Sequence, residues 1–155
     1  SFCSIENSII HDGSSIGPFA RLRNNVDIGK DSKIGNFVEL KNSSLESEVK
    51  VSHLSYIGDA EIDEAVNIGA GTITCNYDGV KKHKTTIGKR AFIGSNSSLI
   101  APINIGDDAN VAAGSSISKN VDSNSLAITR APIRFISNWS KKFKKNNKEE
   151  EKCAE

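Results

Sequence analysis

The stretch that decides the fold is IGPFARLRNNVDIGKDSKIGNFVELK, residues 16–41. Aliphatic residues recur in it at every sixth position, namely Ile16, Leu22, Ile28, Ile34 and Leu40. Neither the 3.6-residue period of an α-helix nor the two-residue alternation of an amphipathic strand produces a step of six. A short strand followed by a tight corner does, and three such hexapeptides make one triangular coil.

The same step returns further along the chain, at Ile87, Ile93, Leu99, Ile105, Val111 and Ile117. Four positions after each aliphatic residue stands a small or β-branched residue, such as Ala20 or Val26, which fits a crowded interior. Between the two runs the step shortens to five, from Leu40 to Leu45 and from Ile57 to Ile62. We therefore predict an all-β chain, a parallel β-helix of hexapeptide repeats that continues with small irregularities.

The repeat is interrupted over residues 70–86, where Gly, Asn and Tyr residues and a basic cluster replace the aliphatic pattern. We expect a projecting loop there, and long loops inside compact repeats are commonly functional. Residues 141–155 are mainly Lys, Asn and Glu and cannot bury enough apolar surface to fold. The predicted organisation is one β-helix domain over residues 1–140, with its loop at about 70–86, and a charged, disordered tail over residues 141–155.

Charge and composition exclude several functional classes. The 20 basic and 19 acidic residues nearly cancel, which argues against a nucleic-acid partner. No apolar run is long enough for a membrane span and no leader is visible, so we expect a soluble, cytoplasmic protein without a membrane partner. Three cysteines, Cys3, Cys75 and Cys153, suit a reducing compartment. The chain has no Met at all, so we expect a piece of a longer protein.

Two polar positions suggest an anion site. Arg23 follows core Leu22 and Lys41 follows core Leu40, and three hexapeptides separate them. The two cations should therefore stack on one side of the coil, where they could bind a phosphate group. The alternative is a pair of solvated surface residues.

His53 is the candidate general base, because imidazole has the unperturbed pKa best suited to proton transfer at neutral pH. A structural histidine is the alternative. His11, His53 and His83 lie too far apart for a zinc pattern, so we predict no metal site. Cys75 could accept an acyl group, but nothing in the sequence around it indicates an activated thiol, and direct transfer is the preferred hypothesis.

Four segments, residues 16–23, 35–41, 53–59 and above all NIGAGTITCNYDG at 67–79, resemble the acetyltransferase half of the bacterial bifunctional N-acetylglucosamine-1-phosphate uridyltransferase/glucosamine-1-phosphate acetyltransferase. The resemblance extends from about Ile16 to Arg130. It implies left-handed coils and a homotrimer with active sites between subunits. It also implies transfer of acetyl from acetyl-CoA to the amine of glucosamine-1-phosphate, a step in UDP-N-acetylglucosamine biosynthesis.

The resemblance assigns roles to individual residues. His53 would be the general base. The residues that would hold the sugar phosphate are Arg23, Lys41, Tyr56, Asn67 and Lys82. The residues that would contact acetyl-CoA are Ala70, Asn76, Tyr77, Ser95, Ala113 and Arg130. No metal is needed for acetyl transfer. The family's Gly-rich nucleotide-binding segment has no counterpart here, so we do not expect its uridyltransferase domain, or the Mg²⁺ that serves it, in this chain.

Two other functions stay open at this stage. One is a hexapeptide acyltransferase with a different acceptor. The other is a noncatalytic β-solenoid scaffold, in which flat faces carry rows of one polar residue. The exposed positions of this chain are mixed in type, which favours an enzyme.

Overall fold

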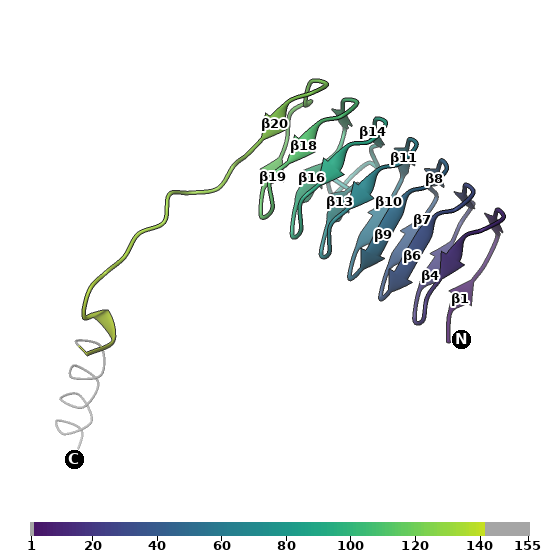
Figure 1. Ribbon diagram of the computed structural model, residues 1–155, viewed down its shortest axis with the longest axis horizontal. Helices are drawn as coiled ribbons and strands as arrows, with labels where there is room; N and C mark the ends of the chain where they lie inside the picture. Colours follow the sequence, from purple (N-terminus) through teal and green to yellow (C-terminus); the bar gives the residue numbers. More distant parts are fainter. Residues whose placement is uncertain (1, 142–155) are drawn as a thin grey trace, which may run out of the picture.

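The computed structural model describes residues 2–141, in which short parallel strands wind into a β-helix (Figure 1). Consecutive strands enter three different sheets, and from β1 to β16 each strand pairs with the third strand after it, while at the end of the coils β18 pairs with β20. Sheet A contains β1 (Ser4–Ile5), β4 (Arg21–Arg23), β7 (Glu39–Lys41), β10 (Tyr56–Gly58), β13 (Ile73–Cys75), β16 (Ser98–Ile100) and β19 (Ser116–Ile117). Sheet B contains β2 (Ser8–Ile10), β5 (Val26–Ile28), β8 (Ser44–Leu45), β11 (Ala60–Ile62), β14 (Thr85–Ile87) and β17 (Ile103–Ile105). Sheet C contains β3 (Ser15–Ile16), β6 (Lys33–Asn36), β9 (Lys50–His53), β12 (Asn67–Ile68), β15 (Phe92–Ile93), β18 (Asn110–Val111) and β20 (Leu126–Ala127).

The register explains the six-residue period. Leu22 pairs with Leu40, which lies three full hexapeptides further along the chain. Leu40 pairs with Ile57, which lies one position short of three hexapeptides, because the coil between them contains one of the five-residue steps. The predicted parallel β-helix of hexapeptide coils is therefore confirmed, and each shortened step removes one residue without breaking the ladder.

The core is a column of aliphatic side chains inside the triangle. Leu22, Leu40 and Ile57 are fully buried, while the residues beside them in the strands face outward. Small hydroxyl residues complete the interior at the corners. The Ser43 hydroxyl, for example, donates to the Lys41 carbonyl at 2.9 Å and accepts from the Ala60 N–H at 3.1 Å, so a tight corner keeps its backbone groups satisfied.

The projecting loop is shorter than the predicted 70–86. Ile73–Cys75 forms β13, which pairs with β10 and β16, and Thr74 takes an interior position at 1 % exposure. The loop spans 76–84, before β14 resumes at Thr85. The expected bounds were too wide because a threonine in place of an aliphatic residue hid one more turn of the coil.

Thr129 still bonds to Ser116 of the last coil, and beyond Arg130 residues 131–141 extend away from the body (Figure 1). Apart from Lys141, the predicted tail 141–155, with Cys153, lies outside the described residues. No helix within residues 2–141 has the length and apolar character needed to span a bilayer.

Candidate functional site

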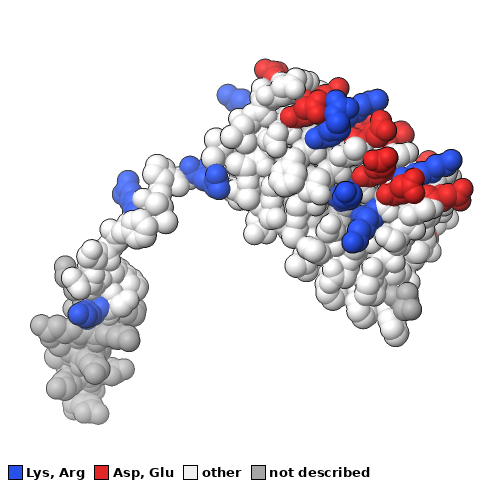
Figure 2. Space-filling view, viewed as in Figure 1, with Lys and Arg blue, Asp and Glu red and all other residues white. Residues whose placement is uncertain are grey.

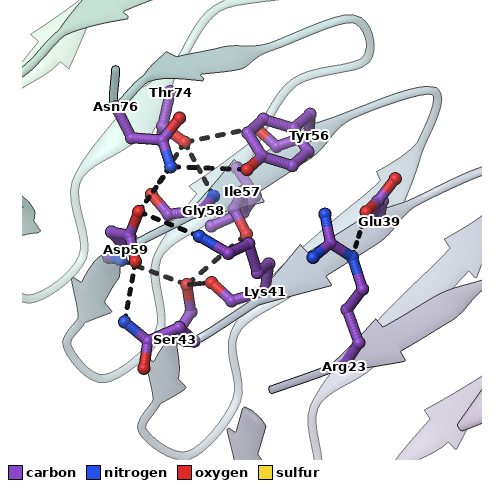
Figure 3. A network of polar contacts seen from close by, with 12 residues as sticks. Arg23, Glu39, Lys41, Ser43, Tyr56, Ile57, Gly58, Asp59, Thr74 and Asn76 are labelled. Carbon is purple, nitrogen blue, oxygen red and sulfur yellow. Dashed lines mark hydrogen bonds and ion pairs between the residues drawn. The ribbon is translucent and has the colours of Figure 1, made fainter. Parts of the chain in front are cut away.

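The predicted stacking of Arg23 on Lys41 is confirmed by the register of sheet A. Arg23 of β4 lies beside Lys41 of β7, and Lys41 lies beside Gly58 of β10. The preceding outward residues, Glu39 and Tyr56, are paired in the same way. One face of sheet A therefore gathers two cations, a carboxylate and a phenol (Figure 3).

Each of the two stacked cations has a carboxylate partner. Arg23 Nε donates to Glu39 Oε1 at 2.6 Å, and Lys41 Nζ lies 3.3 Å from Asp59 Oδ2. The Arg23 side chain is 26 % exposed, whereas those of Lys41 and Asp59 are 9 % and 12 % exposed. The pair of Lys41 and Asp59 is thus largely withdrawn from water, which makes its geometry more consequential than that of a surface ion pair.

Asp59 is the centre of the polar network (Figure 3). Besides Lys41, it accepts from Asn42 Nδ2 at 2.7 Å and from Asn76 Nδ2 at 2.5 Å. Burial raises the pKa of the Asp59 carboxyl, but the hydrogen bonds from Asn42, Asn76 and Lys41 outweigh it, so the pKa is lowered. The carboxylate is therefore ionised at neutral pH.

Gly58 allows two of the site residues to meet. Asn76 Nδ2 also donates to Tyr56 Oη, at 3.3 Å. A Cβ at Gly58 would lie 2.3 Å from Tyr56 Oη and 2.8 Å from Asn76 Nδ2. The absence of a side chain at position 58 is thus what lets the phenol and the amide come together above the strand.

The loop 76–84 returns to this network. Tyr77 and Lys82 form an antiparallel bridge, and the Asp78 carboxylate accepts from the N–H groups of Val80 and Lys81 at the turn. The pKa of the Lys82 ammonium is lowered, chiefly by its contact with the Lys41 ammonium, so the loop brings a further cation to the site. Tyr77 itself is 61 % exposed and donates to the Gly79 carbonyl at 2.7 Å.

The site carries an excess of positive charge. Its cations are Arg21, Arg23, Lys41 and Lys82, and its carboxylates are Glu39 and Asp59. Four positive charges against two negative ones leave a net charge of two. A phosphate monoester carries a negative charge of about 1.5 to 2 at neutral pH and is a matching ligand.

A second group of predicted residues lies along the corner where sheet C passes into sheet A, which we call the C–A corner. Val51 pairs with Ile68, so His53 and Ala70, each two residues on, take equivalent places in successive coils. Asn96 N–H donates to the Ala70 carbonyl and Gly114 N–H to the Ser95 carbonyl, both at 2.8 Å. His53, Ala70, Ser95 and Ala113 therefore form a ridge along the C–A corner, one residue from each successive coil. Arg130 lies beside Gly114 at the end of this ridge.

His53 and the cations border the same sheet from two sides. His53 ends β9 and is exposed, and the chain then turns through Leu54, at φ 55°, into β10. Lys41, Gly58 and Asp59 lie at the far end of sheet A, at the corner that leads to sheet B, which we call the A–B corner. Tyr56 stands between the two corners. Asn67 lies in sheet C beside Lys50 and Phe92, and the single chain does not bring it to the cations.

Sequence reasoning missed Asp59, Asn42 and Gly58. The signal that could have found Asp59 and Asn42 is the shortened repeat itself. Asn42 lies in the five-residue step from Leu40 to Leu45, and Asp59 lies in the step from Ile57 to Ile62. The loop 76–84 leaves the next coil at the same A–B corner. Three successive irregularities at one corner thus mark the site.

A zinc site would depend on the histidines of the chain, and covalent catalysis would depend on Cys75. Within residues 2–141 no group of three or more His, Cys, Asp or Glu side chains is placed to hold a metal ion. His11 pairs with Asp27 at 3.1 Å and His83 with Asp78 at 2.6 Å. Cys75 is a half-buried free thiol in β13, in register with Ile100.

Comparison with known proteins agrees with the repeat. The family "Bacterial transferase hexapeptide (six repeats)" matches residues 7–42, and "Hexapeptide repeat of succinyl-transferase" matches residues 84–119. The bifunctional protein GlmU of Zymomonas mobilis is 54 % identical over 148 residues, which cover 96 % of this chain and 33 % of the relative. GlmU of Thermodesulfovibrio yellowstonii is 57 % identical over 141 residues, 91 % of this chain and 31 % of the relative. The chain thus spans about a third of the length of these curated relatives.

Solved structures share the fold at low identity. Perosamine N-acetyltransferase from Caulobacter crescentus, in complex with CoA and GDP-perosamine, superposes with a TM-score of 0.67 at 20 % identity, covering 83 % of this chain and 58 % of that protein. The acetyltransferase domain of PglB from Neisseria gonorrhoeae, in complex with acetyl coenzyme A, gives 0.65 at 20 % identity, over 79 % and 55 % of the two chains. Taken together, the chain carries hexapeptide repeats of the bacterial transferase type and is similar in sequence to about a third of the length of the bifunctional GlmU proteins.

Proposed function

We propose that this chain transfers the acetyl group of acetyl-CoA to the amine of glucosamine-1-phosphate, giving N-acetylglucosamine-1-phosphate for UDP-N-acetylglucosamine synthesis. The observation that carries the proposal is the stack of Arg23 on Lys41, joined by Lys82 from the loop, on the same sheet face that His53 borders. The high identity to bifunctional GlmU proteins supports the choice of substrates.

The acceptor would lie across the outer face of sheet A. Its phosphate would bind the guanidinium of Arg23 and the ammonium groups of Lys41 and Lys82, because charge-assisted hydrogen bonds to phosphate are the strongest polar contacts this face offers. The sugar ring would pass over Tyr56, and its amine would point toward the C–A corner and His53. Asn67 would take part from sheet C only through a neighbouring subunit.

The proposed reaction is a direct transfer. The His53 imidazole takes a proton from the sugar amine as the nitrogen attacks the thioester carbonyl, and a C–N bond forms. The tetrahedral intermediate collapses with cleavage of the C–S bond, and the CoA thiolate leaves and takes up a proton. The products are the N-acetyl sugar phosphate and free CoA, with no acyl-enzyme on Cys75.

Acetyl-CoA would bind along the C–A corner. Ala70, Ser95 and Ala113 keep the ridge low enough for an extended chain to lie against it, and Arg130 at its end would meet anionic phosphates. Asn76 and Tyr77 would contact the acetyl group from the loop side. We place the enzyme in the cytoplasm, where thiols stay reduced.

We further propose that three copies assemble with sites between them. Phe2, Phe19 and Phe37 stack along the C–A corner, with ring centroids 5.6 and 5.4 Å apart and exposures of 80 %, 51 % and 54 %. Leu54 continues this row at 60 % exposure, one residue from His53. In Figure 2 the charged side chains gather toward one edge of the body, and much of the rest of that face is uncharged. An apolar row beside the site is typical of a surface that a further copy covers.

The test is release of free thiol from acetyl-CoA with glucosamine-1-phosphate as acceptor. Glucosamine and glucosamine-6-phosphate are the controls, because they lack the phosphate at the position that the cations would bind. We expect release that is specific to the 1-phosphate. Equal rates with all three acceptors would contradict the assigned phosphate site, and no release with any of them would contradict the proposed acetyl transfer.

Replacement of His53 tests the mechanism. His53→Ala should lower turnover by about a hundred- to ten-thousandfold, the usual contribution of a general base, and leave the KM for the acceptor nearly unchanged. His11→Ala is the matched control, since His11 is an exposed histidine in an ion pair with Asp27. Turnover of the His53 variant equal to that of the control would remove His53 from the mechanism.

A further inference from the structure

Asp59 has no part in the reaction described above, yet its carboxylate gathers three side-chain donors at the site. It stands at the A–B corner with φ 52°, in the left-handed region that Asp and Asn tolerate better than most residues. Its carboxylate accepts from Lys41 Nζ at 3.3 Å, Asn42 Nδ2 at 2.7 Å and Asn76 Nδ2 at 2.5 Å. With its side chain only 12 % exposed, it acts as a fixed anchor.

Asp59 determines how the Asn76 amide faces. An ionised carboxylate can only accept hydrogen bonds, so the nitrogen of Asn76 must point toward Asp59. The two hydrogens of that nitrogen go to Asp59 Oδ2 and to Tyr56 Oη. The amide oxygen is therefore turned away from Asp59, as Figure 3 shows. Asn76 consequently offers a ligand a hydrogen-bond acceptor and has no N–H left for a developing oxyanion.

Asp59 also fixes one of the phosphate ligands. The Lys41 ammonium has three N–H donors, and the contact with Asp59 uses one of them. The side chain is thereby held across sheet A instead of following the phosphate freely. The donors come from strand β7 and from the loop after β13, so a single carboxylate links two coils of the solenoid at the site.

We propose that Asp59 is a positioning residue, which aims the Lys41 ammonium at the acceptor phosphate and the Asn76 carbonyl oxygen at an N–H of the attacking amine. The inference rests on the proposed acetyl transfer and adds to it a residue that touches neither substrate. It also assigns stabilisation of the oxyanion to a group other than Asn76, because both hydrogens of that amide are already engaged.

The variant that tests this is Asp59→Asn, which keeps the size of the side chain and the preference for positive φ. The new amide keeps only one of the two acceptor oxygens and carries no negative charge, so it cannot satisfy all three donors and holds Lys41 and Asn76 less firmly. Asp108→Asn is the matched control, because Asp108 also has positive φ, 55°. Asp108 lies outside the site and forms an ion pair with Arg90, with the nitrogen and oxygen 2.7 Å apart. Circular dichroism would verify that both variants fold.

We expect Asp59→Asn to lower kcat by about tenfold or more relative to Asp108→Asn, a change that corresponds to about 1.4 kcal/mol, because hydrogen bonds to charged groups are stronger than those between neutral groups. The KM for glucosamine-1-phosphate should change less, because loss of a carboxylate charge near the phosphate offsets the looser hold on Lys41. A role in stability alone would leave kcat per folded site unchanged. A kcat within threefold of the control would overturn the proposal.

A second readout does not depend on turnover. The Asn76 side-chain amide should give slowly exchanging ¹⁵N–¹H signals in the wild type and in Asp108→Asn, and fast-exchanging signals in Asp59→Asn. Equal exchange in all three proteins would overturn the assigned hold of Asp59 on Asn76. A wild type that releases no thiol but shows this difference would contradict the proposed function while supporting the positioning geometry.

Discussion

Gly58→Ala is the substitution for which the structure gives the most definite expectation. The three atoms nearest to a Cβ at this position all belong to side chains, Tyr56 Oη at 2.3 Å, Tyr56 Cζ at 2.6 Å and Asn76 Nδ2 at 2.8 Å. Ordinary contact begins at 3.4 Å, so the phenol must move by about 3.4 minus 2.3, or 1.1 Å. A displacement of about 1 Å in a positioned group can lower a rate by about a hundredfold, which corresponds to about 2.7 kcal/mol.

The assay is thiol release with glucosamine-1-phosphate, together with thermal unfolding. No backbone atom is among the three nearest contacts and Gly58 does not have positive φ, so the variant should keep the melting temperature of the wild type. In a Tyr56→Ala background the same change should lower the rate much less, because the ring that it displaces is already absent. Turnover of Gly58→Ala within threefold of the wild type, in a folded protein, would refute this reasoning.

Two further predictions concern stability. The pKa of Asp59 is lower in the folded chain than in the unfolded chain, where it is about 4. The stabilisation by the ionised carboxylate is therefore complete above about pH 4. It is lost as the pH falls through the folded-state pKa, because the unfolded chain then binds more protons than the folded one. Urea unfolding should therefore show the wild type more stable than Asp59→Asn at pH 7, with a gap that narrows below about pH 4; a gap independent of pH would contradict the lowered pKa. Leu99→Ala, at a fully buried core position, should lower the free energy of unfolding by about 2 to 5 kcal/mol. Leu126→Ala, at a position 65 % exposed, is the control and should lower it much less. Equal losses of unfolding free energy in the two variants would contradict the described core.

The six-residue step was enough to predict the coils and the stacking of Arg23 on Lys41, because a strict period fixes both which side chains point inward and which coils adjoin. Thr74 shows the limit of that reasoning. It occupies an interior position, but a hydroxyl does not register in an aliphatic pattern, so β13 was assigned to the loop. Its hydroxyl is satisfied by the backbone of Gly58, at 2.8 Å from the N–H and 3.1 Å from the carbonyl oxygen, and this depends on a neighbouring coil that the local sequence does not reveal.

Asp59 was missed for a related reason. Its donors Lys41 and Asn76 belong to the coils before and after it, and Asp59 itself stands at a corner, where the repeat sets no residue type. The step from Ile57 to Ile62 showed only that something was irregular there. The residue roles implied by family resemblance did not include Asp59, whose carboxylate contacts the side chains of Lys41, Asn42 and Asn76.

The arrangement also explains why this fold can carry a site at one corner without losing stability. Each coil contacts its neighbours through inward side chains and ladder hydrogen bonds, so a corner can gain or lose residues while the strands on either side keep their register. Ile62 pairs with Ile87 across the coil that contains loop 76–84, and Ile87 pairs with Ile105 in the next coil, which has the regular length of three hexapeptides. The coil with the loop is longer than this regular length. Ile62, Ile87 and Ile105 are nevertheless all buried in the core, at 2 % exposure or less. Because the ladder tolerates such changes at the A–B corner, the shortened steps at Asn42 and Asp59 and the long loop after β13 could bring Lys41, Asp59, Asn76 and Lys82 together while the core beneath them stays regular.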